Sequence, residues 1–325
     1  MVNKIYIFFI MCIVLCIACV ETKIFIQLYP DGNAYFKFIS RGDSTDVFNN
    51  DFVHPKNLNS WRTTNKKLVN KETGDDNWLL STEGTNSDSI IFFIDDQETS
   101  LKYSFSQSIK KEFFTNEYSI AFFIQGSKIK QDFPRLYEAI LVDNLDSLYW
   151  LPEVLTILMH KGLQDIAHDS LSTYQELWNQ RLVNHLNNSF ANITTLDDLE
   201  IIQNNREEYL TSLLRPFNVG QSFPGLLAKK MEKHETILKN ALDLDDDTFT
   251  VKVKLPGKII STNANTMIND TLKWEFTLDS LLSEDYILKA NSITYSIEKL
   301  KISLISVLII LFIFSGILLK KYYKI

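Results

Sequence analysis

Five histidines and a run of aspartates are the residues of this chain whose types and spacing could support chemistry. The histidines are His54, His160, His168, His185 and His234. His160 and His168 are eight positions apart, with Asp165 and Asp169 beside them, whereas two metal ligands on adjacent helical turns prefer a spacing of four. The spacing therefore favours an ordinary polar helix surface over a metal site.

The acidic run at residues 243–247 has the charge density of a calcium-binding loop. An EF-hand loop that began at Asp243 would need Gly at its sixth position, for a sharp turn, and Glu at its twelfth, as a bidentate ligand. Those positions hold Thr248 and Lys254. The run is better explained as a solvated connector after a helix, so we expect neither a metal site nor a cofactor.

The sequence contains no motif that would identify an enzyme or a nucleic-acid-binding protein. It has no G-x-S-x-G element, no P-loop and no glycine-rich nucleotide turn. Its net charge is −7, and no basic stripe alternates with aromatic residues, so nucleic acid is not an expected partner. We therefore expect no catalytic residue, although a site that converges only in the fold remains an alternative.

An apolar segment near the C-terminus predicts a transmembrane helix at residues 302–319. These eighteen residues carry no charge and would rise about 27 Å as a helix, close to the roughly 30 Å of a hydrocarbon core. Tyr322 and Tyr323, beside three lysines, resemble an interfacial belt. If this helix spans the membrane, residues 320–325 form a cytoplasmic tail. The alternative interpretation is a buried core helix.

The N-terminal segment, residues 1–19, has the layout of a signal peptide. Lys4 precedes an apolar run that contains all three cysteines of the chain. The residues around Cys19 resemble a bacterial lipobox, in which the lipidated cysteine becomes the new N-terminus, although Cys16 stands where that pattern prefers Leu, Val or Ile. Cys19 is therefore a candidate lipidation site; ordinary signal-peptidase cleavage and an uncleaved anchor are the alternatives.

The two end segments together predict the topology and the compartment. A signal peptide directs export of the chain behind it, and an apolar helix then stops the transfer, so the body between about residues 20 and 300 lies outside the cytoplasm. The body contains no cysteine and hence no disulfide, which suits a bacterial protein better than a eukaryotic ectodomain. We expect a single-pass protein of the bacterial cell membrane.

Hydrophobic periodicity divides the body into a β-rich part at residues 20–133, a helical insert at 134–245 and a second β-rich part at 246–300. Asp31-Gly32 joins two alternating runs and predicts a hairpin. A helical stripe runs from Val154 to Leu182, with a break near Gly162 or Ser170. The simplest architecture is an α+β fold in which both β blocks share an antiparallel sheet and the insert packs on it. A β domain with a separate helical domain is the alternative.

One stretch resembles a known family. Residues 249–292 read FTVKVKLPGKIISTNANTMINDTLKWEFTLDSLLSEDYILKANS, in which Trp274 alternates with Leu272 and Phe276 as on an inward strand face. This stretch, together with the hairpin at residues 23–40, resembles the LppM-type domain of bacterial envelope lipoproteins. The resemblance implies an extracytoplasmic α+β domain that binds lipid or envelope components, and it supplies no catalytic residues.

These observations predict a membrane-anchored extracytoplasmic protein. Its expected role is non-enzymatic binding, with membrane lipid and other envelope proteins as the partners. The alternative function is an envelope enzyme whose site is assembled only in the fold.

Overall fold

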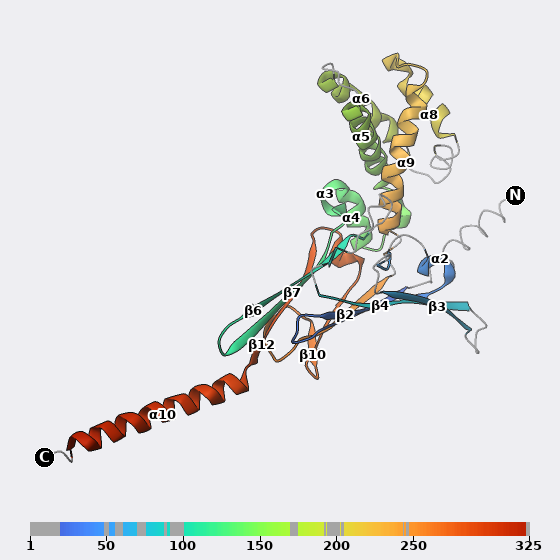
Figure 1. Ribbon diagram of the computed structural model, residues 1–325. Coiled ribbons are helices and arrows are strands. Elements are labelled where there is room, and N and C mark those ends of the chain that lie inside the picture. The colour runs from blue at the N-terminus through green and yellow to red at the C-terminus, as the bar shows by residue number, and fades with distance from the viewer. Residues whose placement is uncertain are drawn as a thin grey trace.

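The computed structural model describes residues 20–48, 52–55, 61–69, 76–87, 90–91, 101–169, 175–191, 193, 202, 205–242, 244 and 247–322. Cys19 and the rest of the predicted signal peptide lie outside these residues, as do Asp243, Asp245 and Asp246 of the acidic run. The described chain forms a β-sandwich, a helical insert at one end of it and a long C-terminal helix that leaves it at the other (Figure 1).

The first sheet combines strands from both β-rich blocks. Its order is β10 (Thr266–Ile268), β11 (Thr271–Phe276), β8 (Thr248–Lys254), β1 (Glu21–Leu28), β2 (Ala34–Gly42), β4 (Asp76–Asn86) and β3 (Arg62–Val69). The first strand of the chain, β1, lies antiparallel to β2 and parallel to β8. The hairpin predicted at Asp31-Gly32 is present. Gly32 has a φ of +100°, a backbone angle that residues with a side chain rarely adopt.

The second sheet has the order β5 (Ile90–Ile91), β6 (Tyr103–Lys111), β7 (Thr115–Ile124), β12 (Tyr286–Tyr295) and β9 (Lys258–Thr262). The inward faces of the two sheets form a core rich in aromatic residues, in which the ring of Phe36 lies 4.9 Å from that of Phe105. Leu272, Trp274 and Phe276 are all buried, as their alternation predicted. Two sheets form because strands from both β blocks carry one apolar face each, and packing face to face buries them all.

The helical insert follows β7 and returns to β8. It contains α3 (Ile129–Asp132), α4 (Pro134–Leu141), α5 (Leu151–Asp169), α6 (Gln175–Phe190), α8 (Arg206–Leu214) and α9 (Phe223–Leu242), with short 3₁₀ turns at Leu145–Ser147 and Arg215–Phe217. Of the two expected break points in the helical stripe, α5 continues through Gly162, and Ser170 lies outside the described residues. Gly162 lies against Met231, and a Cβ there would come within 3.1 Å of its side chain, so glycine lets α5 and α9 pack closely.

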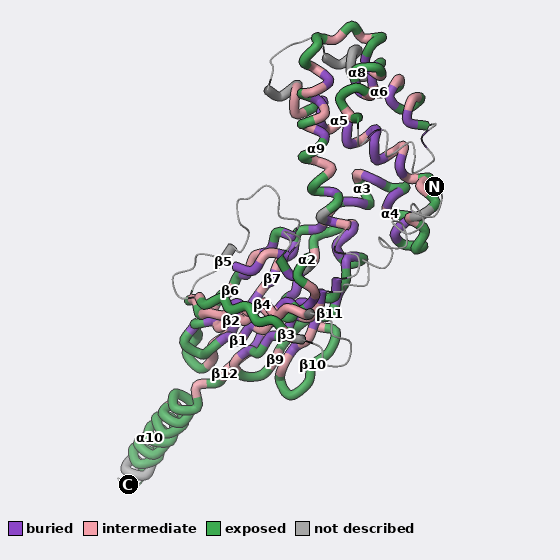
Figure 2. Tube along the Cα trace, turned by 90° about the vertical axis from the view of Figure 1, so that its right-hand side faces the viewer, coloured by how far each residue is buried: buried purple, intermediate pink, exposed green. Residues whose placement is uncertain are grey.

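The α+β class and the sharing of sheets by both β blocks are confirmed, but the strands form two sheets rather than one, and β1 pairs with β8 in parallel. The insert packs at the open end of the sandwich, where the core continues without interruption into α4, α5 and α9 (Figure 2). This end offers the apolar surface for that contact, because the two inner sheet faces already cover each other.

The C-terminal helix α10 (Ile297–Tyr322) continues directly from β12. Its apolar stretch Ile297–Leu318 is 22 residues long, with a mean hydropathy of 2.5 and no burial over its most apolar window. Such a stretch rises about 33 Å, enough to cross a hydrocarbon core of about 30 Å. The exposure of α10 argues against a buried core helix, and the helix is long and apolar enough to span a membrane.

Candidate functional site

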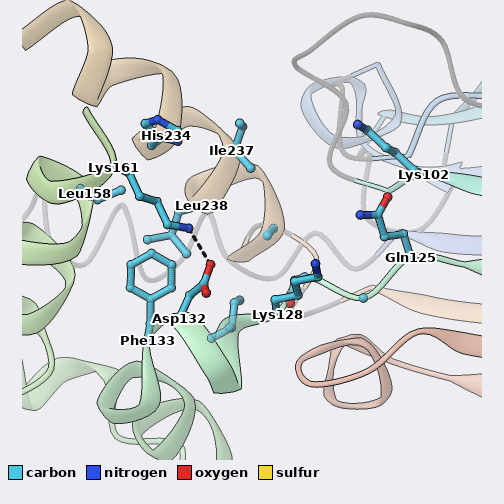
Figure 3. Close-up of a pocket in the computed structure, with 14 residues that line it drawn as sticks. Lys102, Gln125, Lys128, Asp132, Phe133, Leu158, Lys161, His234, Ile237 and Leu238 are labelled. Atoms are coloured by element: carbon cyan, nitrogen blue, oxygen red, sulfur yellow. Dashed lines mark hydrogen bonds and ion pairs between the residues drawn. The ribbon is translucent and has the colours of Figure 1, made fainter. Parts of the chain in front are cut away.

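A pocket of about 220 Å³ lies where the β-sandwich meets the helical insert (Figure 3). Lys102 and Gln125 line it from the sandwich side, and Lys161 and His234 line it from α5 and α9. Gly126, Ser127 and Lys128, in the short connection from β7 to α3, also line it. The pocket therefore depends on how the insert is attached to the sandwich.

The connection between β7 and α3 is fixed to the loop before β12. The backbone N–H of Gly126 donates to Asp285 Oδ1 at 3.0 Å, and the N–H of Ser127 donates to the carbonyl of Leu281 at 2.8 Å. A Cβ on Gly126 would lie 2.4 Å from the carbonyl oxygen of Glu284, so only glycine fits this close approach. These contacts join parts of the chain that are far apart in sequence and set the position of the pocket.

The charged side chains of the pocket leave an excess of positive charge. Lys161 Nζ lies 2.5 Å from Asp132 Oδ2 and 5.2 Å from the ring centroid of Phe133. Lys102 and Lys128 are exposed, and within the described part of the chain neither has an ion-pair partner. Among the described residues, the pocket therefore offers two lysines without an ion-pair partner, and these could bind an anionic group.

His160 and Asp165, which lie close together in the sequence, have different partners in the structure. Asp165 Oδ2 contacts His234 Nε2 of α9 at 3.0 Å, and His160 contacts its neighbour Gln164 on α5. The side chains of His168 and Asp169 are not among those described. Among the described residues, no group of three or more His, Cys, Asp or Glu side chains could hold a metal ion.

His185 and His54 take part in packing. His185 Nε2 lies 2.9 Å from the carbonyl of Leu213, and its ring meets Phe217 edge to face, which joins α6 to the end of α8 and the 3₁₀ turn after it. His54 is 3% exposed and lies against Phe38 and Phe52 in the sandwich. Neither histidine lines the junction pocket.

A buried chain of hydrogen bonds around His54 was not predicted. Ser40 Oγ lies 2.9 Å from His54 Nε2 and 3.0 Å from Thr22 Oγ1, and Thr82 Oγ1 lies 3.1 Å from His54 Nδ1. A serine beside a histidine is the arrangement of an activated nucleophile, in which a third group orients the histidine. Here a hydroxyl stands at Nδ1, and the serine is buried. Polar residues at the inward positions of β1 and β2 were the signal that could have revealed this cluster.

A buried tyrosine holds the segment that carries His54. The hydroxyl of Tyr103 donates to the carbonyl of Val53 at 2.5 Å, and its ring stacks on Phe52 with centroids 5.1 Å apart. Burial raises the pKa of Tyr103, so the phenol stays protonated and remains a donor. The segment is thereby fixed against the second sheet.

We expect Ser40→Ala to lower the free energy of unfolding by about 1–3 kcal/mol, because it leaves the buried ring of His54 without one hydrogen-bond partner. Chemical denaturation followed by circular dichroism measures this loss.

The native protein should not react with a fluorophosphonate probe at Ser40. Labelling of Ser40 that His54→Ala abolishes would instead favour the enzyme alternative.

No protein-family model matches the chain, and no curated protein matches it in sequence. Among solved structures, the NMR structure of the folded domain of LppM from Mycobacterium tuberculosis is similar, with 7% sequence identity and a TM-score of 0.28. The match covers 87% of this chain and 94% of that one. The similarity to LppM is a weak, fold-level resemblance, and no ligand or activity follows from it.

Proposed function

We propose that this chain is a single-pass membrane protein whose extracytoplasmic body binds an acidic segment of a partner protein, without catalysis. The observation that carries the proposal is the pocket at the junction of sandwich and insert. There Lys102 and Lys128 have no ion-pair partner among the described residues, and they lie beside the apolar Ile237 and Leu238. In this proposal α10 is the anchor, and the body lies outside the cytoplasm of a bacterial cell.

The distance between the pocket and α10 favours a protein partner over a lipid of the same bilayer. Ile124, which precedes the pocket segment, pairs with Tyr286, whereas α10 follows Tyr295 at the other end of β12. These ten residues span about 30 Å at roughly 3.4 Å per residue. Headgroups around α10 are therefore far from the pocket, and membrane lipid is the partner of α10 instead.

The size of the pocket supports a small binding group. Its volume of about 220 Å³ lies below the roughly 300–1,000 Å³ of pockets that enclose drug-sized ligands. It suits one or two carboxylate side chains better than a cofactor or an acyl chain. The lysines supply the attraction, and Ile237 and Leu238 supply apolar contact beside it.

The position of Val20 supports α10 as the single anchor. The N–H of Val20 donates to Asp247 Oδ1 at 3.2 Å, and its carbonyl accepts from Thr248 at 3.1 Å. Because β1 runs parallel to β8, Val20 lies at the end of the sandwich from which the insert emerges, away from α10. A lipid on Cys19, the residue before Val20, would extend from the end of the sandwich opposite α10. It would therefore point away from the bilayer that α10 spans, so we favour signal-peptidase cleavage without lipidation.

Reversing two charges tests the pocket. We expect Lys102→Glu with Lys128→Glu to weaken binding of an oligoglutamate peptide about tenfold, since each exposed charge contributes up to about 1 kcal/mol and tenfold is about 1.4 kcal/mol. Isothermal titration calorimetry of the full chain in detergent measures the affinity. Lys258→Glu, an exposed lysine at the other end of the sandwich, is the matched control and should leave it unchanged.

Equal affinity of the double variant and the unaltered protein for oligoglutamate would contradict the proposal. Oligolysine of the same length should not bind, and its binding would count against a cationic site. A photo-crosslinking residue at Gln125, compared with one at Lys258, identifies the partner in cells. We expect an adduct at Gln125 alone, and one that the double charge reversal removes.

A further inference from the structure

The turn between β6 and β7 exposes two adjacent aromatic residues at the end of the sandwich where α10 begins. Phe113 is 66% exposed and Phe114 is 38% exposed. Their rings meet edge to face, with centroids 4.7 Å apart at 87°. Burial of these two rings against an apolar surface would be favourable, and an exposed apolar patch of adjacent side chains is a candidate membrane contact.

This turn is attached to the first residues of α10. The carbonyl of Phe114 accepts a hydrogen bond from the N–H of Ser296 at 2.8 Å, immediately before the helix. Lys299, within the first turn of α10, places its Nζ 5.7 Å from the ring centroid of Phe113. Thr115 pairs with Tyr295 across the ladder of β7 and β12. The two aromatic residues therefore have a fixed height along the axis of α10.

That height corresponds to the headgroup layer of a bilayer. The uncharged run of α10 begins at Ile302, three residues after Lys299 and six after Ser296, which is about 4.5 Å and 9 Å along a helix. The polar layer on each side of the hydrocarbon is about 5–8 Å thick. Phe113 and Phe114 thus lie beside the part of α10 that passes through this layer, the depth at which interfacial segments bury Trp, Phe and Leu side chains.

We propose that the β6–β7 turn inserts Phe113 and Phe114 into the headgroup layer of the bilayer that α10 spans. The exposed Tyr295 and Ile297 extend the same apolar surface along the start of the helix. The inference rests on the proposed anchoring of α10. It adds a second membrane contact, which fixes the rotation of the sandwich and holds the junction pocket away from the lipid.

The charges around the turn indicate that apolar contact drives the insertion. Lys110, Lys111, Lys299 and Lys301 lie near it, together with Glu112 and Glu298. Lys110 is paired with Glu112 at 2.6 Å, so part of the positive charge is neutralised within the turn. Insertion should therefore occur into neutral phosphatidylcholine and should persist in high salt, where contacts between exposed charges are screened.

Depth-dependent quenching tests the inference. In a full chain whose three cysteines are replaced by alanine, Phe113→Cys carries an environment-sensitive fluorophore in phosphatidylcholine vesicles. We expect lipids with a shallow nitroxide to lower its emission roughly twofold, and lipids with a deep nitroxide to do less, because the turn reaches only the headgroup layer. Met267→Cys, 57% exposed on the edge strand of the first sheet, is the matched control and should keep its emission.

A third position separates the two possible failures. A fluorophore on Ile309→Cys, in the middle of α10, should be quenched most by the deep nitroxide. Quenching at position 309 without quenching at position 113 would overturn the inference and leave the anchor intact. Emission at position 309 that no lipid quenches would overturn the anchor itself.

A variant without a label gives a second measurement. Phe113→Ser with Phe114→Ser should make Lys299 and Lys301 more accessible to trypsin in vesicles, because the turn no longer holds them at the bilayer. Met267→Ser with Ile268→Ser removes similar exposed apolar surface elsewhere and should leave the cleavage rate unchanged. Equal rates for the two double variants would contradict the insertion.

Discussion

Two lysines in the middle of α10, Ile309→Lys with Ile310→Lys, are expected to move the protein from the membrane to the soluble fraction. Each lysine at the centre of a transmembrane helix costs about 2.5–3.5 kcal/mol of insertion free energy, so the pair removes most of the driving force. Alkaline carbonate extraction, followed by immunoblotting of pellet and supernatant, measures the change.

Two matched variants make this result specific. Met267→Lys with Ile268→Lys adds the same charges to exposed residues of β10, and this protein should stay in the pellet. Cys19→Ala should also stay there, because α10 is the only anchor in this account. Release by Cys19→Ala, or retention of the α10 variant, would assign the membrane attachment to the N-terminal segment instead.

Truncation of Trp274 to alanine is expected to lower the free energy of unfolding by about 3–5 kcal/mol, as for other buried large aromatic residues. Trp274 is fully buried in the sandwich, and its Nε1–H donates to Asn263 Oδ1 at 3.1 Å. The same oxygen accepts from the N–H of Lys289 in β12 at 2.7 Å. The indole therefore fills the core and links the first sheet to the second.

Urea denaturation of the full chain in detergent, followed by circular dichroism, measures that loss. Met267→Ala, on the same sheet but exposed, should change the free energy by less than about 0.5 kcal/mol. Trp274→Phe should fall between the two, since it keeps an aromatic ring and loses the hydrogen bond. A loss below about 1 kcal/mol for Trp274→Ala would show that the two sheets do not share this core.

The parts of the fold that local sequence determines were predictable. The alternation around Trp274 predicted an inward strand face, and Asp31-Gly32 predicted a hairpin. The uncharged run that begins at Ile302 predicted an apolar helix that is not part of the core. Each depends on residues within a few positions of one another, and periodicity or turn chemistry reports such relations directly. The break considered at Gly162 is absent, because this glycine serves the packing of α5 on α9 rather than helix termination.

The sequence predicted that the two β blocks share sheets, but not which of their strands pair or in which direction. The parallel pairing of β1 with β8 joins residues more than 200 positions apart, such as Glu21 and Thr248, and no local pattern reports it. The contact of His234 with Asp165 likewise depends on how α9 packs on α5. The junction pocket arises because Gly126 contacts the loop at Glu284. Lys102 and Lys128 therefore line one pocket only in the folded chain.

Labelling of cysteines in intact bacterial spheroplasts with a membrane-impermeant maleimide tests the central claim most directly. The central claim is that α10 crosses the membrane once, with the sandwich and the insert outside. In a cysteine-free background, Met267→Cys on the body should react at once, whereas Lys324→Cys in the tail should react only after the membrane is permeabilised. Immediate labelling at position 324, with protection at position 267, would contradict the account.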